Sequence, residues 1–183
     1  MAQVILHDRL QYVPTRCYLM LLGRGMQAAC RIDPTLSQEA SDIPVGTIIA
    51  LVVGEKGPAM FMYKGANHLL YIGDGSSKKF NPAGLPSTAT IRIRSLREAR
   101  LIFKFAESPV AAIAKGRVSI EGAVSLACRF LRILNLTEIY LLPRAMACRM
   151  VKRYQAPPHL NRRKFAVGAA MLFDKRGKAD DTL

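Results

Sequence analysis

Few side chains in this sequence have the types and spacing that catalysis or metal binding requires. The three histidines, His7, His68 and His159, stand far apart, and none of them has the spacing of a metal ligand. No Gly-x-Ser-x-Gly segment, which holds the nucleophile of many hydrolases, is present. Glu107 and Glu121 could be brought together by folding, but nothing suggests a carboxyl pair with a raised pKa. We therefore expect no catalytic residue, no metal, no cofactor and no enzymatic activity.

The cysteines do not form a ligand motif either. All four are too widely spaced for Cys-x-x-Cys ligation: Cys17, Cys30, Cys128 and Cys148. Three of them fall within apolar stretches of helical pattern. We expect buried, unreactive thiols in a reducing compartment.

One glycine motif allows a cofactor interpretation. Residues 23–28 fit the Gly-x-Gly-x-x-Ala fingerprint of dinucleotide-binding folds. That fingerprint requires a strand before it, a long helix after it and a second parallel strand, but only Met26 to Ile32 remain before Asp33 and Pro34. We interpret the segment as the loosened second half of a helix.

The charge is strongly positive and unevenly distributed. The chain of 183 residues has 27 Lys and Arg against 13 Asp and Glu, a net charge of +14, and residues 143–183 alone hold ten basic and three acidic side chains. Such an excess favours anionic partners, namely acidic lipid or nucleic acid. In this region four basic residues alternate with apolar ones and suit reversible contact with an anionic membrane or a partner, although a solvated helix face explains them equally well: Arg144, Arg149, Lys152 and Arg153.

A second basic cluster follows Pro157 and Pro158, and its members are Arg162, Arg163 and Lys164. It predicts either an unstructured tail or an RNA-contacting arm. No apolar run reaches the roughly 18 to 20 residues that a membrane-spanning helix needs. The N-terminus does not resemble a signal peptide, because Asp8 and Arg9 interrupt it. We expect a cytoplasmic protein that can attach peripherally to the inner face of the membrane.

The elements that must position any site follow from periodicity. Residues 3–31 predict a helix that Pro14 interrupts, and residues 33–44 predict a linker. Four strands are indicated after it, over residues 47–53, 59–64, 68–72 and 89–94, the first three as an antiparallel meander. In the fourth, Ile91 and Ile93 share one face.

The chain from Ser95 onward returns to helical patterns. Ser95 is expected to cap a helix, with Glu98 completing a capping box, and the next short helix over residues 109–115 ends at Gly116 in a left-handed conformation. Residues 117–121 alternate as a short strand. Gly122 then turns the chain into an amphipathic helix over residues 123–134.

This succession resembles the sterol carrier protein type two family of lipid-transfer domains. The likeness covers residues 45–135, about half of the chain. Its most specific part is the segment Gly116-Arg117-Val118-Ser119-Ile120-Glu121-Gly122, which has the family pattern of two glycines around alternating hydrophobic residues, followed by an amphipathic helix. Ala123 departs from the acidic or amide residue that the family often has there, which weakens any expectation of a helix cap.

The resemblance implies an α+β fold: a mixed, mostly antiparallel five-stranded sheet covered on one face by helices, with an apolar tunnel between the layers. It implies a carrier that binds an acyl chain, a sterol-like lipid or an isoprenoid quinone intermediate, and that works with a lipid- or quinone-processing enzyme. Apolar residues on the predicted strands and helices would contact the lipid: Ile91, Ile93, Ile102, Phe103, Val118, Ile120, Val124, Ala127, Phe130, Leu131 and Leu134.

Within one globular unit, we expect a helical extension and linker over residues 1–43, a lipid-binding core over residues 44–142, and a basic helix and tail over residues 143–183. Two other interpretations stay open. A nucleic-acid-binding module could use one basic face, although aromatic residues between its members are scarce: Arg92, Arg94, Arg97, Arg100 and Lys104. An interaction protein could instead have a cleft filled by its own side chains.

Overall fold

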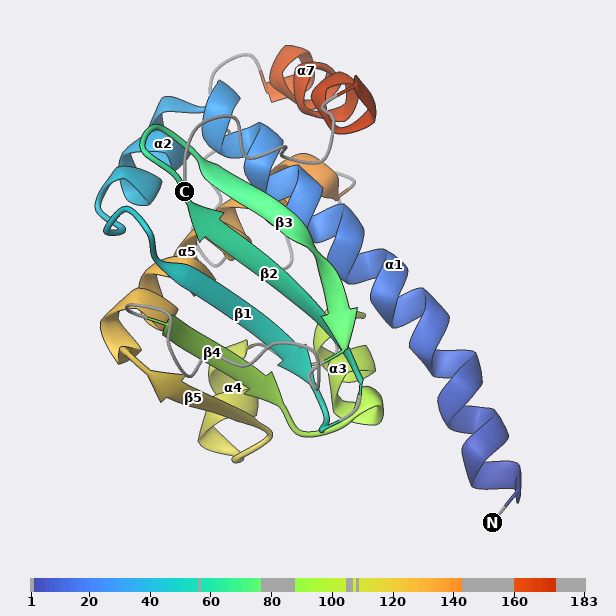
Figure 1. Ribbon diagram of the computed structural model, residues 1–183. Helices are drawn as coiled ribbons and strands as arrows, with labels where there is room; N and C mark the ends of the chain where they lie inside the picture. The colour runs from blue at the N-terminus through green and yellow to red at the C-terminus, as the bar shows by residue number, and fades with distance from the viewer. Residues whose placement is uncertain are drawn as a thin grey trace.

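The computed structural model describes residues 2–55, 57–76, 88–104, 107, 109–142 and 160–173. Their helices and strands follow one another along the chain as drawn in Figure 1. In chain order they are α1 (Ala2–Ile32), α2 (Pro34–Ser41), β1 (Ile48–Val53), β2 (Pro58–Lys64), β3 (Leu69–Ser76), β4 (Thr88–Ile93), α3 (Leu96–Phe103), α4 (Pro109–Ala114), β5 (Val118–Gly122), α5 (Val124–Leu141) and α7 (Leu160–Phe173).

The five strands form one sheet in the order β3-β2-β1-β4-β5. β1, β2 and β3 are a meander of antiparallel neighbours, and β4 pairs with β5 antiparallel. β1 and β4 run parallel, with Leu51 opposite Ile91. The predicted α+β class with a mixed, mostly antiparallel sheet is therefore confirmed.

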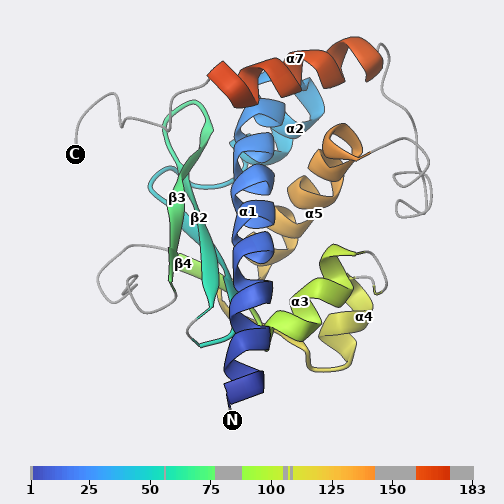
Figure 2. The same ribbon diagram turned by 90° about the vertical axis from the view of Figure 1, so that its right-hand side faces the viewer.

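The helices lie on one side of this sheet (Figure 2). The main hydrophobic core joins the helix-facing residues of all five strands to α1, α2, α3, α5 and α7. β1 contributes Ile49, Leu51 and Val53 to this core, and β2 contributes Met60 and Met62. The intervening residues of these strands belong to a separate small cluster on the other face: Ala50, Val52, Ala59 and Phe61.

α1 is a single helix of 31 residues that continues through Pro14, so the predicted interruption was wrong. A proline within a helix removes one backbone hydrogen bond, which a long helix can tolerate when the rest of it is packed. Leu19, Leu22 and Met26 are fully buried against the sheet and supply that packing. Gly23 lies so close to β3 that a Cβ there would stand 2.5 Å from the ring of Tyr71.

The predicted linker over residues 33–44 contains the helix α2, so this prediction was wrong in part. Asp33 has extended backbone angles, and its carboxylate accepts hydrogen bonds from the backbone N–H groups of Thr35 (2.7 Å) and Leu36 (3.3 Å). Pro34 occupies the first turn, where its missing N–H costs nothing. An N-cap followed by proline is a helix-start signal, and it outweighed the loop-like composition.

The turns before and after β5 are formed by the glycines that the sequence predicts. Gly116 has a φ of +64°, and its N–H donates to the carbonyl of Ile113, which closes α4. Gly122 has a φ of +86° and turns the chain into α5, where Ala123 makes no side-chain cap, as its departure from the family pattern indicated. Ser95 caps α3 through the N–H of Glu98. α5 extends to Leu141, beyond the predicted end.

The basic cluster of residues 162–164 is not an unstructured tail, because it lies near the start of α7, and two of its side chains hold that helix in place. Arg163 donates to the carboxylate of Asp33 at 2.9 Å, and Lys164 donates to the carbonyl of Leu142 at 2.6 Å. Val167 is buried in the core. α7 is therefore attached both to the α1–α2 junction and to the end of α5.

Candidate functional site

The residues predicted to contact a lipid gather on the helix-facing side of β4 and β5 and on the helices above them. Ten of the eleven are buried or half-buried: Ile91, Ile93, Ile102, Phe103, Val118, Ile120, Ala127, Phe130, Leu131 and Leu134. Val124 is 58% exposed, because it begins α5 before that helix reaches the sheet. The tunnel itself stays a prediction.

Strand register explains how the apolar surface is built. Across β1, β4 and β5, one row of neighbouring residues consists of Leu51, Ile91 and Ile120. Two residues further along β1 and β4, a second row consists of Val53, Ile93 and Val118. Side chains two residues apart share a sheet face, so these two rows are stacked. Together they form an apolar floor that faces α5 and α3.

A polar group lies at the junction of α1, α3 and α5, on an otherwise apolar surface. The hydroxyl of Tyr18 on α1 donates to Oε1 of Glu138 on α5 at 3.4 Å. The Tyr18 ring also stacks on Phe103 of α3, with centroids 4.4 Å apart. We call Tyr18 and Glu138 the carboxyl–phenol pair.

Burial controls the ionisation of this pair. It raises the pKa of Glu138 from its ordinary value of 4.5 to about 7, and the hydrogen bond from Tyr18 offsets only part of that effect. Burial also raises the pKa of the Tyr18 phenol, and the nearby Glu138 charge raises it further. Near neutral pH, Glu138 is therefore present in both protonation states, so its carboxyl can donate or accept one hydrogen bond to a polar group of an apolar ligand.

The sequence interpretation missed this pair. Glu138 follows Leu134 by four residues and Leu131 by seven, so it continues the apolar stripe of α5. An acid in that position is the one available signal. Its partner Tyr18 is 120 residues away in the sequence, and only the packing of α1 along α5 brings the two together.

Glu107 and Glu121, the two acids that the sequence analysis considered as a pair, are not paired with each other. The carboxylate of Glu107 binds Lys115 at 2.6 Å and Arg117 at 2.7 Å. The hydrogen bond from Lys115 is the main cause that lowers the pKa of Glu107. Glu121 binds Arg92 at 3.0 Å. Each of these two acids therefore has its own basic partners.

The five members of the predicted basic face do not share one surface. The Arg92 side chain lies on the sheet face opposite the helices, in register with Val52 and bound to Glu121. Arg97 lies in α3 and Lys104 is the C-cap of that helix, so both lie on the side of the sheet that the helices cover. The four residues predicted to contact a membrane lie outside the described part of the chain: Arg144, Arg149, Lys152 and Arg153.

The thiols differ from the prediction of uniform burial. Cys17 and Cys128 are exposed, because they occupy the outer faces of α1 and α5. Cys30 is buried, and burial raises the pKa of its thiol to about 12, which keeps it protonated. Among the described residues, no group of three or more His, Cys, Asp or Glu side chains could hold a metal ion.

Gly23 and Gly25 lie inside α1, so the dinucleotide fingerprint has no strand-to-helix loop here. In the part of the chain that the structure covers, none of the helices combines the length and apolarity needed to span a bilayer.

The sequence matches no model of a known protein family, and a search of curated proteins finds no match. Among solved structures, the chain is similar to a protein described as "UbiJ-SCP2 Ubiquinone synthesis protein". The TM-score is 0.45 and the sequence identity 16%, and the match covers 68% of this chain and 96% of that chain. At this TM-score and identity, the likeness supports no conclusion about a ligand or an activity of this chain.

Proposed function

We propose that this protein is a carrier that binds a hydrophobic lipid between the sheet and the helices α3 and α5, and releases it without chemical change. The lipid would be an acyl chain, a sterol-like molecule or an isoprenoid quinone intermediate. The observation that supports this proposal most is the apolar floor of β1, β4 and β5, together with one ionisable pair at the α1–α3–α5 junction that stacks on Phe103. An apolar site with a few convergent polar groups is typical of small-molecule binding.

The side chains around this floor are suited to a variable occupant. Met60 and Met62 on β2 and Met26 on α1 are fully buried in the core. Methionine is unbranched and flexible, so it can fill irregular space and adjust when that space changes. Leu131, Ile102 and Phe103 are only half-buried and pack against the same core. Lipid entry between α3 and α5 therefore requires few fully buried side chains to move.

Energetics favour a docking step. Each buried methylene yields about 0.8 kcal/mol, so a chain of about fourteen carbons gains on the order of 11 kcal/mol relative to water. Relative to a bilayer it gains almost nothing, so exchange with a membrane needs contact but no energy input. Reversible attachment to an anionic membrane, or to a lipid- or quinone-processing enzyme, would supply that contact.

α7 offers one surface for this docking. Phe165 is 81% exposed and Leu172 is 80% exposed, and the two residues stand seven positions apart on the outer face of the helix. Arg162 is exposed on the first turn of the same helix. Apolar side chains beside a basic one suit the interface of an anionic membrane. Figure 2 shows α7 at the end of the molecule opposite the N-terminus.

Titration with a fluorescent fatty acid tests the carrier proposal. Ala127 is fully buried on α5, so Ala127→Trp should fill the proposed lipid space and abolish probe binding. Cys128→Trp places the same side chain on the exposed face of α5 and should leave binding unchanged. Ala127→Leu, a smaller change, should weaken binding without unfolding the protein. Equal probe affinity of all these variants would contradict the proposal. So would a wild-type protein that binds nucleic acid but not the fatty acid, with an affinity for nucleic acid that falls steeply with salt.

A further inference from the structure

Lys64, at the end of β2, is a buried lysine with no counter-ion among the described residues. Its side chain faces the helices, and the residue is only 3% exposed. Among the described residues, none forms a hydrogen bond or an ion pair with its ammonium group. Taking an ammonium group out of water costs several kcal/mol unless an opposite charge or good acceptors compensate. Such a group therefore requires an explanation.

A second polar group without a partner lies directly beside Lys64. Thr47 precedes β1 and stands opposite Lys64, because Ile48 pairs with Tyr63 and the N–H of Lys64 donates to the carbonyl of Thr47. Thr47 is 1% exposed, and in the described part of the chain its hydroxyl has no hydrogen-bond partner. An ammonium and a hydroxyl on neighbouring strands can both donate to one anion.

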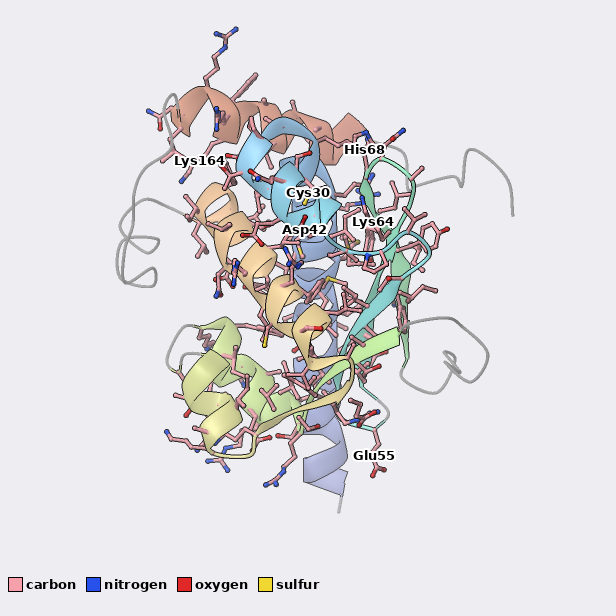
Figure 3. The ribbon with its side chains drawn as sticks, turned by 90° about the vertical axis from the view of Figure 1, so that its left-hand side faces the viewer. Cys30, Asp42, Glu55, Lys64, His68 and Lys164 are labelled. Carbon is pink, nitrogen blue, oxygen red and sulfur yellow. The ribbon has the colours of Figure 1, made fainter. Side chains whose placement is uncertain are left out.

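The nearest groups of the protein do not neutralise Lys64. The Cys30 thiol is close enough for the Lys64 charge to lower its pKa, but burial dominates, so the thiol stays protonated and uncharged (Figure 3). Asp33, the acid on the same side of the core, already binds Arg163, Tyr140 and the N-cap N–H groups of α2. No acid among the described residues pairs with Lys64, so its ammonium group is available to an added anion.

We propose that Lys64 and Thr47 bind the anionic head group, a carboxylate or a phosphate, of the lipid that the protein carries. This inference rests on the proposed function and specifies its ligand as an acidic lipid rather than a neutral one. β1 runs from Thr47 past Ile49 to Leu51, where the apolar floor of β4 and β5 begins. A head group at Lys64 therefore leaves its apolar tail aligned with that floor.

Two ligands with the same tail test the inference, namely oleate and oleyl alcohol, each displacing the fluorescent fatty acid. The wild type should bind oleate about tenfold or more tightly than the alcohol, the factor of one good charge-assisted hydrogen bond. Lys64→Met should bring the two affinities to near equality by weakening only the acid, and Thr47→Val should reduce the preference partly. Lys104→Met removes the same charge from an exposed position and should leave the preference unchanged.

The outcomes separate this inference from the proposed function. Equal binding of acid and alcohol by the wild type, or an unchanged preference in Lys64→Met, would overturn the head-group assignment and leave the carrier intact. Binding of neither ligand would refute both. Inorganic phosphate alone should not raise the Tm of the wild type. A rise that Lys64→Met abolishes would assign the site to a free anion and not to a lipid.

A stability measurement on the lipid-free protein supplies a second readout. Replacing an uncompensated buried charge by a side chain of similar shape is stabilising. Lys64→Met should therefore raise the Tm by several degrees, whereas Lys104→Met should change it little. A lower Tm for Lys64→Met would mean that the ammonium has a partner within the protein, which contradicts the inference.

Discussion

The Tyr18 hydroxyl donates to the Glu138 carboxyl at 3.4 Å and joins α1 to α5, next to Phe103 of α3. Among the described residues, Glu138 is the carboxyl whose pKa is raised to about 7, and its partner Tyr18 stacks on Phe103, which is proposed to contact the lipid. Protonation of Glu138 therefore links the stability of the helix layer to pH. Any hydrogen bond from a ligand to this carboxyl depends on the same proton.

Glu138→Gln should remove a pH dependence of stability. Because the pKa of Glu138 is raised in the fold, the native state binds more protons than the unfolded state between pH 4.5 and about 7. The unfolding free energy contributed by this group is therefore highest below pH 4.5 and falls as the pH rises through 7. At about 1.4 kcal/mol for each tenfold change in the ionisation constant, the fall is about 3 kcal/mol. Urea unfolding of both proteins at about pH 5 and pH 8 measures it.

The matched control is Glu121→Gln, whose carboxylate is exposed and bound to Arg92. It should change stability by less than about 1 kcal/mol, as expected for a surface ion pair. If Glu138→Gln and the wild type lose stability equally between the two pH values, Glu138 is not the buried titrating group.

Gly23→Ala should destabilise the protein, although alanine is ordinarily the better helix former by about 1 kcal/mol. A Cβ at this position would lie 2.5 Å from the ring of Tyr71 and 3.1 Å from the sulfur of Met60, so α1 would have to move away from the sheet. We expect a loss of about 1–3 kcal/mol, the usual cost of overpacking. Gly168→Ala in α7 has open space around it and should instead stabilise slightly. A gain in both variants would show that α1 does not pack closely on β2 and β3.

Asp33→Ala should loosen α7. The Asp33 carboxylate caps α2 and accepts hydrogen bonds from Tyr140 of α5 and Arg163 of α7. Loss of the cap and of a buried acceptor should lower the unfolding free energy by about 2 kcal/mol. Hydrogen exchange should accelerate in residues 160–173 more than in β1. The control Asp42→Ala removes an exposed partner of Arg129, and uniform exchange changes in both variants would argue against a specific anchor.

The same carboxyl predicts a response to acid. Burial alone raises the pKa of Asp33, but the hydrogen bonds from Tyr140, Leu36 and Thr35 and the charge of Arg163 together lower it below its ordinary value of 3.8. Stability from this group is present above that value and is lost as the pH falls through the lower native pKa.

Phe165→Ser combined with Leu172→Ser should weaken membrane attachment. Both side chains are exposed, so their removal costs the fold little, whereas an interface would lose two apolar anchors. Co-sedimentation with vesicles containing phosphatidylglycerol, compared with pure phosphatidylcholine vesicles, measures the effect. Ile72→Ser removes an exposed apolar residue from the sheet and serves as control. Equal sedimentation of the double variant and the wild type would exclude α7 as the docking surface.

The sequence predicted the strands well because their alternation and flanking glycines are local signals. Gly116 and Gly122 adopt the positive φ values that their spacing suggested, and Val118 is buried between them. Local signals failed where tertiary packing decides: α1 continues through Pro14 because its second half is buried, and residues 162–164 form a helix that long-range contacts to Asp33 and Leu142 hold.

The candidate site could be predicted only in its apolar part. Residues such as Ile91 and Ala127 follow from periodicity, since each element must bury one face. The carboxyl–phenol pair and the Lys64–Thr47 neighbours depend on contacts between segments far apart or on strand register. A single lysine at the end of an apolar strand is indistinguishable from a solvated one until the helices above it are placed.

Mass spectrometry of an organic extract of the purified protein tests the central claim most directly. The account predicts a hydrophobic lipid with an acidic head group, in near-stoichiometric amount, that is present with wild type and Cys128→Trp and absent with Ala127→Trp. An extract without lipid from the folded wild-type protein, together with no binding of added acyl chains, would contradict it.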